Sequence, residues 1–213
     1  MIALVAGASG LTGAELLKIL EQDERFQRVY VLARRPFEVV SEKTIPLFFE
    51  KNIYEIDSLP GPSPEVVFCC LGTTIKKAGS QSAFRFVDVE LVSQLIARSE
   101  QWGTTCFVLQ SSVGSGQKTQ NFYLQCKTEA EAILNQSSIP IKRIIRPSLL
   151  LGKRKEQRFG ENIGKILAVL FGFLFLGRLK RYKPVHAKNV ALKMLDIALN
   201  PNEGKQVIES EQI

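Results

Sequence analysis

A tyrosine and a lysine stand four residues apart, at Tyr123 and Lys127, in a segment whose pattern is typical of a helix. Residues at this spacing lie on one face of a helix. A phenol has a pKa of about 10 and works as an acid or base near neutrality only where a neighbouring cation stabilises the phenolate. The pair therefore predicts a carbonyl-reducing site, in which Tyr123 protonates the substrate oxygen as hydride arrives and Lys127 supplies the cation.

A pair of serines, Ser111 and Ser112, lies at the end of the expected strand that precedes this helix. A serine hydroxyl in that place can polarise the carbonyl oxygen that the tyrosine protonates. We expect Ser112 to have this role because it lies nearer the loop, with Ser111 as the alternative. The predicted catalytic residues are thus Ser112, Tyr123 and Lys127. The last two are also expected to contact the cofactor, Lys127 at the nicotinamide ribose.

A glycine-rich segment, Gly7-Ala-Ser-Gly-Leu-Thr-Gly13, separates the first expected strand from the first expected helix. Glycines permit a tight turn and a close backbone approach, and the N-terminus of a helix offers free N–H groups to a pyrophosphate. A glycine-rich turn alone is weak evidence, but its place at the first strand-to-helix junction favours dinucleotide binding. The predicted contacts are Gly7, Ser9, Gly10, Leu11 and Thr12.

Two adjacent arginines, Arg34 and Arg35, end the second expected strand, about 20 residues beyond the glycine-rich segment, where dinucleotide sites read the adenosine ribose. An NAD site usually has an acidic residue here, whereas an arginine suits the 2′-phosphate of NADP. Guanidinium groups offer the planar, multiply donating surface that a phosphate favours. We therefore expect NADPH or NADP as the cofactor. The alternative is a pair of solvated arginines at a strand end.

A third candidate for cofactor contact, Leu71-Gly72-Thr73, follows the fourth expected strand. The carboxyl edge of a parallel sheet is where dinucleotides bind. Gly72 would allow a close approach of the ligand, and the hydroxyl of Thr73 could hydrogen-bond to it. A plain turn after the strand is the alternative.

The elements that must position these residues alternate along the chain between short apolar runs and longer amphipathic segments. Short, continuously apolar runs are typical of parallel strands covered on both faces. The pattern predicts an α/β fold, a doubly wound parallel sheet over residues 1–150, followed by a small C-terminal cap over residues 151–213. The expected strands are Ile2–Ala6, Arg28–Ala33, Thr44–Phe48, Glu65–Cys70, Thr104–Leu109, Ile141–Ile145 and Gln206–Glu209, and the expected helices are Leu11–Gln22, Ser82–Glu100, Asn121–Gln136, Ile163–Leu176 and Ala187–Leu199.

The composition excludes several other classes of protein. The chain has 213 residues, of which 45% are hydrophobic and 23% charged, as in ordinary globular domains. With four cysteines and one histidine and no pair at metal-ligand spacing, we expect no metal site. Neither a G-x-S-x-G elbow nor a P-loop occurs, which argues against a serine hydrolase and an NTPase. The N-terminus reads as a strand rather than a targeting segment, so a cytoplasmic location is expected.

Positive charge is concentrated in residues 142–183, which contain 12 Lys or Arg residues and only two acidic residues. This stretch carries +10, and because the whole chain carries +7, the remainder carries −3. A solvated face that also attracts anionic ligands is the expected reading, and no nucleic-acid motif accompanies the charge. The apolar segment 163–176 predicts a buried helix or a lid, and the alternative is peripheral membrane contact through residues 163–183.

The order of the motifs resembles that of the short-chain dehydrogenase/reductase superfamily. The glycine-rich segment, the serine pair and Tyr-x-x-x-Lys follow one another as in those enzymes. Three strings, Phe-Cys-Cys-Leu-Gly-Thr-Thr at 68–74, Asn-Phe-Tyr-Leu-Gln at 121–125 and Arg146-Pro147, are similar to the atypical, Tat-interacting oxidoreductase-like branch. The resemblance covers nearly all of residues 1–200. It implies a Rossmann fold, NADPH binding and Ser112, Tyr123 and Lys127 as the active set.

Two functions from different classes follow from these observations. The first is an NADPH-dependent oxidoreductase that reduces a carbonyl group of a small or lipophilic molecule. The second is an NADPH-binding regulatory or interaction protein with little or no turnover, since the resembled branch includes such members. Epimerisation or dehydration with a retained cofactor is a third alternative. Superfamily members often pair through helices, so an oligomer remains open, and the substrate is unnamed.

Overall fold

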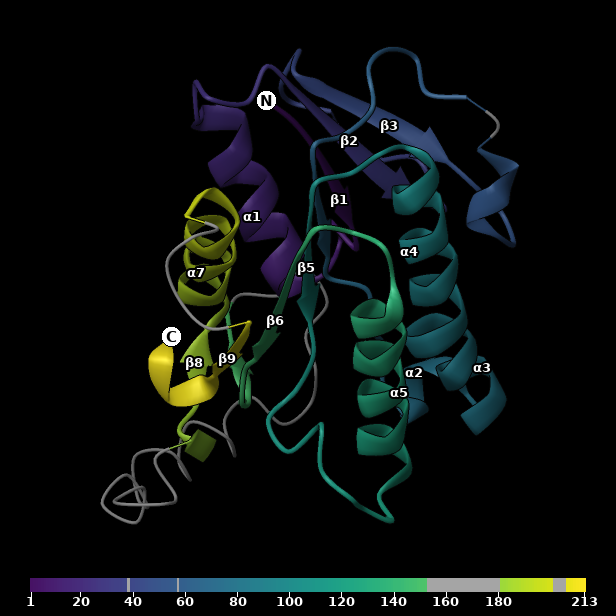
Figure 1. Ribbon diagram of the computed structural model, residues 1–213, viewed down its shortest axis with the longest axis vertical. Helices are drawn as coiled ribbons and strands as arrows, with labels where there is room; N and C mark the ends of the chain where they lie inside the picture. The colour runs from purple at the N-terminus through teal and green to yellow at the C-terminus, as the bar shows by residue number, and fades with distance from the viewer. Residues whose placement is uncertain (38, 57, 153–180, 201–205) are drawn as a thin grey trace.

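The computed structural model describes residues 1–37, 39–56, 58–152, 181–200 and 206–213 (Figure 1). A seven-stranded sheet forms its centre, with the strand order β3-β2-β1-β4-β5-β6-β9, and every neighbouring pair in it is parallel. The strands are β1 (Ile2–Ala6), β2 (Arg28–Ala33), β3 (Thr44–Phe48), β4 (Val66–Cys69), β5 (Cys106–Gln110), β6 (Ile141–Arg146) and β9 (Val207–Glu209). A separate parallel pair joins β7 (Leu150–Leu151) to β8 (Val185–His186).

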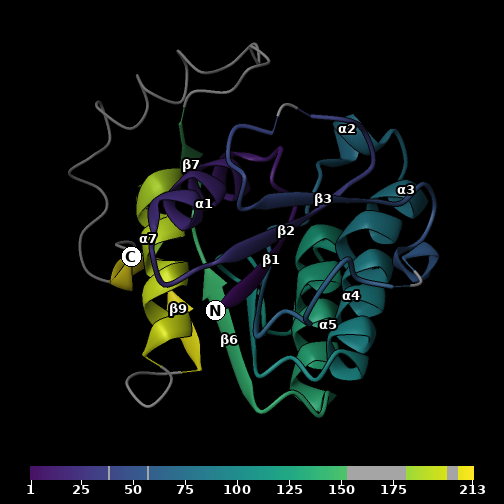
Figure 2. The same cartoon turned by 90° about the horizontal axis from the view of Figure 1, so that it is seen from above.

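Helices cover both faces of the sheet. Figures 1 and 2 place α1 and α7 on one face and α4 and α5 on the other. The helices are α1 (Leu11–Gln22), α2 (Ile75–Ala78), α3 (Gln81–Arg85), α4 (Leu91–Gln101), α5 (Phe122–Gln136) and α7 (Ala187–Leu199), with short turns at Ile53–Glu55 and Ser210–Gln212. The predicted α/β fold with a doubly wound parallel sheet is confirmed.

The apolar runs of the strands divide between two cores. In β1, Leu4 and Ala6 pack in the cluster that includes α4 and α5, whereas Ala3 and Val5 pack in the cluster that includes α1 and α7. Each strand is therefore buried on both faces. This explains why the strands read as continuous apolar runs rather than as an alternation of apolar and polar residues.

The strand order has a switch point between β1 and β4. From β1 the chain builds outward to β3, then returns to the other side of β1 and builds outward again. In open α/β sheets, ligands bind beyond the carboxyl ends of the strands at such a point. The loops that follow β1 and β4 contain two of the predicted cofactor segments, and they flank this switch point.

The predicted helix Ser82–Glu100 differs from the structure. It is divided into α3, a π-helical turn over Phe86–Glu90, and α4. The apolar spacing runs on through the turn, so the pattern could not reveal it. A π turn inside a helix frequently marks a functional position, and this one contains the buried carboxylate of Asp88.

The C-terminal residues return to the sheet. The helix and the edge strand that the sequence predicts here are both present: α7 packs against α1, and β9 extends the sheet beside β6. The division into residues 1–150 and 151–213 stays a prediction. The predicted helix Ile163–Leu176 lies outside the described residues, as does most of 163–183. None of the helices in the described ranges is long and apolar enough to cross a bilayer.

Candidate dinucleotide-binding and carbonyl-reducing site

The glycine-rich loop is fixed by its close approach to the loop after β4. Gly7 has a φ of +84°, and a Cβ at this position would lie 2.5 Å from the carbonyl oxygen of Cys70. The N–H of Gly10 donates to the carbonyl oxygen of Gly7 at 2.9 Å, which closes the turn before α1. Only glycine fits at position 7, because a side chain there would be both strained and blocked.

The start of α1 fits the phosphates of a dinucleotide. Its N-cap residue, Gly10, has no side chain to cap the helix, and the first turn contains no acidic residue. The hydroxyl of Thr12, a residue only 2% exposed, has no hydrogen-bond partner among the described residues. A buried hydroxyl without a partner is costly, and the first N–H groups of a helix have no partner within the helix. A pyrophosphate supplies acceptors for both.

The other predicted residues of this loop lie around the same helix end. Ser9 and Gly10 are exposed and Leu11 is half-buried. Gly7, Ser9, Gly10, Leu11 and Thr12 are thus brought together beyond the carboxyl end of β1, at the switch point.

The segment Leu71–Thr73 lies against a buried ion pair. The N–H of Thr73 donates to Oδ2 of Asp88 at 2.9 Å. A Cβ on Gly72 would lie 3.4 Å from Nζ of Lys127 and 3.5 Å from Oδ1 of Asp88. The predicted cofactor loop and the predicted catalytic lysine, which are far apart in the sequence, therefore meet at one place.

Asp88 is a site residue that the sequence reasoning missed. Its side chain is fully buried, and its Oδ1 lies 2.8 Å from Nζ of Lys127, whose side chain is 8% exposed. A signal was present, since Asp88 stands four residues after Phe84 and three before Leu91, and both of these are buried. An acidic residue on the apolar stripe of a helix needs a buried partner.

The charge of Lys127 is set by two opposing effects. Burial is the largest single effect and lowers the pKa of its amine, but the charge of Asp88, the Tyr123 phenol and the hydrogen bond to Asp88 together outweigh burial, so that the pKa lies above its ordinary value. Lys127 is therefore a firmly held cation. It is not a free one, because the carboxylate beside it offsets its charge.

Tyr123 lies in the first turn of α5, one turn before Lys127. The helix is capped by Asn121, whose Oδ1 accepts from the N–H of Leu124 at 3.2 Å. The Tyr123 ring is half-buried and meets the buried ring of Phe84 edge to face, with 5.8 Å between the ring centroids. Packing against α3 therefore holds the phenol in place on the same helix as the lysine.

The two serines differ in their surroundings. Ser111 is 4% exposed, and its Oγ lies 3.0 Å from Oγ of Ser115. Ser112 is half-buried, and within the described part of the chain no hydrogen bond engages its hydroxyl. The geometry favours Ser112 over Ser111 as the residue that can reach a substrate, because the Ser111 hydroxyl already has a partner.

Arg34 and Arg35 are exposed after β2. Arg34 lines an open hollow of about 610 Å³ at the ends of β2 and β3, together with Pro36, Phe48, Phe49, Glu50 and Glu55. Neither guanidinium has a hydrogen bond or ion pair within the ranges that the structure describes. Both guanidinium groups are therefore open to solvent beyond the end of β2.

Sequence comparison finds close similarity to two groups of proteins. Rat protein HTATIP2 is 30% identical over 215 residues, which cover 98% of this chain and 86% of HTATIP2. The mitochondrial protein FMP52 of Eremothecium gossypii is 30% identical over 217 residues, which cover all of this chain and 96% of FMP52. The chain belongs to the HTATIP2 and FMP52 family. The resemblance to the atypical short-chain dehydrogenase/reductase branch is thereby confirmed. A search against protein-family profiles gives no match.

Solved structures agree with this fold. MoeE5 in complex with UDP-glucose and NAD has a TM-score of 0.68 over 98% of this chain and 75% of its own, at 18% identity. The Bordetella bronchiseptica enzyme WbmG in complex with NAD has a TM-score of 0.70 over 97% of this chain and 71% of its own, at 13% identity. At such identities the likeness establishes the Rossmann fold alone.

The comparisons correct one prediction. The cytoplasmic location expected from the N-terminus is wrong, because the FMP52 relatives from several yeasts are named mitochondrial proteins. The reasoning failed because a Met1 that runs directly into a buried first strand says nothing about the compartment in which the folded protein works.

Proposed function

We propose that this HTATIP2 and FMP52 family protein is an NADPH-dependent oxidoreductase that reduces a carbonyl group of a small or lipophilic molecule. One observation carries the proposal: Lys127 lies against Gly72 in the cofactor loop and is one turn from Tyr123. This contact supports a site in which the dinucleotide and the phenol of Tyr123 lie together beyond the carboxyl end of β4.

When bound, the reduced nicotinamide supplies a hydride to the carbonyl carbon. Tyr123 gives its phenolic proton to the carbonyl oxygen, so that an alcohol forms and the phenolate remains. Ser112 donates a hydrogen bond to the same oxygen as negative charge develops on it. The ammonium of Lys127 stabilises the phenolate until a proton returns from solvent. Gly7, Ser9, Gly10, Leu11, Thr12, Leu71, Gly72 and Thr73 form the cradle for the dinucleotide.

The preference for NADPH over NADH rests on Arg34 and Arg35. Both guanidinium groups are exposed, and Arg34 lines the hollow beyond β2. A 2′-phosphate there would accept charge-assisted hydrogen bonds from them, which a ribose hydroxyl could not match.

The test is oxidation of NADPH against a panel of aldehydes, ketones and quinones, with Tyr123→Phe as the variant. Tyr54→Phe is the matched control, since it removes the same oxygen from an exposed ring outside the site. We expect turnover with at least one carbonyl, lost in Tyr123→Phe and kept in Tyr54→Phe. Turnover that survives in Tyr123→Phe would refute the assignment of the acid.

A second function, NADPH binding with little turnover, is favoured by Asp88. Its carboxylate lies 2.8 Å from Nζ of Lys127 and offsets the charge that a phenolate needs. Protein that binds NADPH, as measured by titration of cofactor fluorescence, but oxidises it with no carbonyl of the panel would favour this second function.

A further inference from the structure

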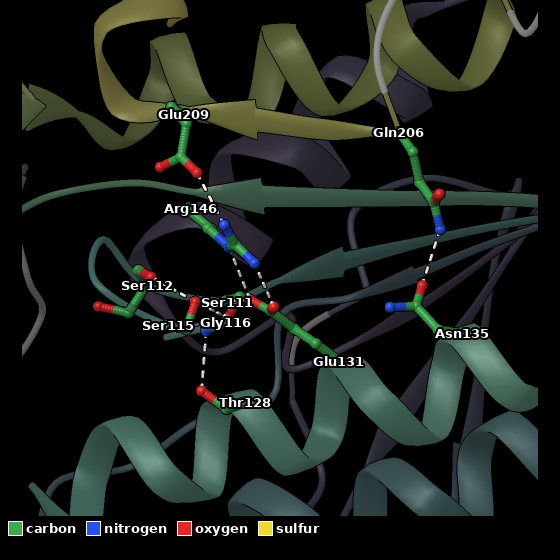
Figure 3. A network of polar contacts seen from close by, with 10 residues as sticks. All are labelled: Ser111, Ser112, Ser115, Gly116, Thr128, Glu131, Asn135, Arg146, Gln206 and Glu209. Carbon is green, nitrogen blue, oxygen red and sulfur yellow. Dashed lines mark hydrogen bonds and ion pairs between the residues drawn. The ribbon is translucent and has the colours of Figure 1, made fainter. Parts of the chain in front are cut away.

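A buried polar network lies against the serine loop, residues 111–116. Its centre is Glu131 of α5, which is 3% exposed (Figure 3). The guanidinium of Arg146, at the end of β6, binds both carboxylate oxygens of Glu131, from Nε at 3.0 Å and from Nη2 at 2.6 Å. The remaining Nη1 of Arg146 binds Oε1 of Glu209 on β9 at 2.7 Å.

Ser115 connects this network to the serine loop. Its Oγ, in a residue 1% exposed, lies 2.5 Å from Oε1 of Glu131 and 2.7 Å from the carbonyl oxygen of Ser112. The single proton of the hydroxyl is thus shared between two acceptors, and Oγ of Ser111 lies 3.0 Å away as a further partner. Glu131 therefore contacts the backbone of Ser112 through one intervening side chain.

Two further contacts fasten the same loop to its surroundings. The N–H of Gly116 donates to Oγ1 of Thr128 on α5 at 2.8 Å. Gly116 has a φ of +76°, and a Cβ on it would collide with the guanidinium of Arg146. The loop is therefore packed directly on the arginine, which is possible only because residue 116 has no side chain.

The C-terminal strand takes part in this arrangement. Arg146 and Glu209 are register partners in the parallel pair β6–β9, and Nε2 of Gln206 donates to Oδ1 of Asn135 on α5 at 2.7 Å. Figure 3 shows Arg146 between Glu131 on one side and Glu209 on the other. The last strand of the chain thus reaches the serine loop through an unbroken series of ion pairs and hydrogen bonds.

We propose that Glu131 and Ser115 are positioning residues, which hold Ser112 in the correct place relative to Tyr123 and Lys127. Through Arg146 and Glu209, the C-terminal strand β9 contributes to the same support of the serine loop. The inference rests on the proposed function. Helix α5 contains Tyr123, Lys127 and Glu131 at successive turns of one face, so the helix that carries the acid also fixes the loop that carries the serine. Errors of about 1 Å between such groups can cost on the order of 100-fold in rate.

The chain offers a matched control for this test on the same helix. Glu129 also pairs with an arginine through both oxygens, to Arg85 at 2.5 and 2.6 Å, and within the described residues no hydrogen bond or ion pair joins its carboxylate to residues 111–116. Ser115→Ala removes the hydroxyl that links Glu131 to Ser112, keeps the backbone hydrogen bond from residue 115 to the carbonyl oxygen of Ser112, and leaves the ion pairs of Glu131 intact. It therefore separates positioning from folding in case Glu131→Gln does not fold.

Steady-state kinetics with NADPH and the best carbonyl of the panel should show kcat lowered by about 10- to 100-fold in Ser115→Ala and Glu131→Gln. The Kd for NADPH should stay within about twofold, and Glu129→Gln should match the wild type. Ser115→Ala should add no further loss to Ser112→Ala, because both act through one hydroxyl. An additive loss, or an unchanged kcat in Ser115→Ala, would overturn the proposal.

Hydrogen exchange of the amides in residues 111–116 gives an answer that does not depend on activity. We expect faster exchange in Ser115→Ala and Glu131→Gln and unchanged exchange in Glu129→Gln. If the wild type binds NADPH but turns over no carbonyl, the proposed function fails, and hydrogen exchange alone then decides whether Ser115 and Glu131 hold the serine loop in place. Unchanged exchange in Ser115→Ala would then overturn it.

Discussion

Replacing Asp88 with asparagine tests the charge balance of the site most directly. The carboxylate is fully buried and lies 2.8 Å from Nζ of Lys127, which is 8% exposed. Asparagine keeps the shape, and its oxygen can still accept from the N–H of Thr73. Its amide nitrogen would then face the ammonium as a second donor. Leaving a buried charge without its partner costs about 3–5 kcal/mol, and we expect Asp88→Asn to lose this much free energy of unfolding at pH 7.

The pH dependence of stability should reverse its sign in this variant. In the wild type the pKa of Lys127 lies above its ordinary value of 10.5, so its contribution to stability is complete below pH 10.5 and is lost as the pH rises through the higher folded value. In Asp88→Asn the largest raising effect is gone, and burial, which is the largest effect of all, lowers the pKa of the amine. The folded state then binds fewer protons than the unfolded state below pH 10.5, so stability rises with pH.

Urea unfolding followed by circular dichroism at pH 7 and pH 9 measures both effects. Asp88→Asn should be more stable at pH 9 than at pH 7, and adding Lys127→Met should restore part of the loss, since the buried charge is then gone. Asp196→Asn is the matched control, because it breaks an exposed pair with Lys193 and should cost below about 1 kcal/mol. If Asp88→Asn lowers the free energy of unfolding by less than about 1 kcal/mol, and this free energy is the same at pH 7 and pH 9, the buried ion pair is refuted.

Two further predictions concern the cofactor cradle. Thr12→Val removes a buried hydroxyl that has no partner within the described residues, so it should raise the free energy of unfolding without ligand by up to about 1 kcal/mol and yet weaken NADPH binding. Urea unfolding measures the first effect and fluorescence titration the second, and an unchanged Kd for NADPH would remove Thr12 from the site. Arg34→Ala should raise the Kd for NADPH by about tenfold and leave the Kd for NADH unchanged, because only the 2′-phosphate needs the guanidinium. An equal change of both Kd values in the same titration would contradict the preference for NADPH, and Arg35→Ala measures how much the second arginine contributes to NADPH binding.

Much of the fold could be predicted because local pattern and tertiary structure agree. The apolar runs of β1, β2 and β4 are continuous because both faces of the sheet are covered, and this marks a parallel sheet. The glycine at position 7 marks the first turn because only glycine fits against Cys70. Helix α7 and strand β9 were predicted close to their observed bounds, because their amphipathic spacing ends at clear breaks.

The parts that escaped prediction depend on contacts between distant residues. The place of Asp88 on the apolar stripe of a helix signals a buried carboxylate, but the sequence does not show that Lys127 is its partner. Glu131 and Glu209 are 78 positions apart in the numbering, and only the pairing of β6 with β9 shows that Arg146 joins them. The sequence favours Ser112 over Ser111 by its place near the loop, but it does not show that Ser115 engages the hydroxyl of Ser111.

Asp88 also separates the two candidate functions on physical grounds. A lone ammonium acts on a phenolate as a full charge, whereas an ammonium paired at 2.8 Å acts as a dipole, whose field falls more steeply with distance. A reductase consumes the phenolic proton of Tyr123 in each turnover, so kcat for carbonyl reduction should fall toward the alkaline end of the range between pH 6 and 9. A cofactor-binding protein should oxidise NADPH with no carbonyl at any of these pH values. The pH profile of kcat, set beside that of the Kd for NADPH, therefore tests the role of Tyr123: a kcat that falls while the Kd stays level supports an acid at this position, and a kcat that rises with pH would refute it.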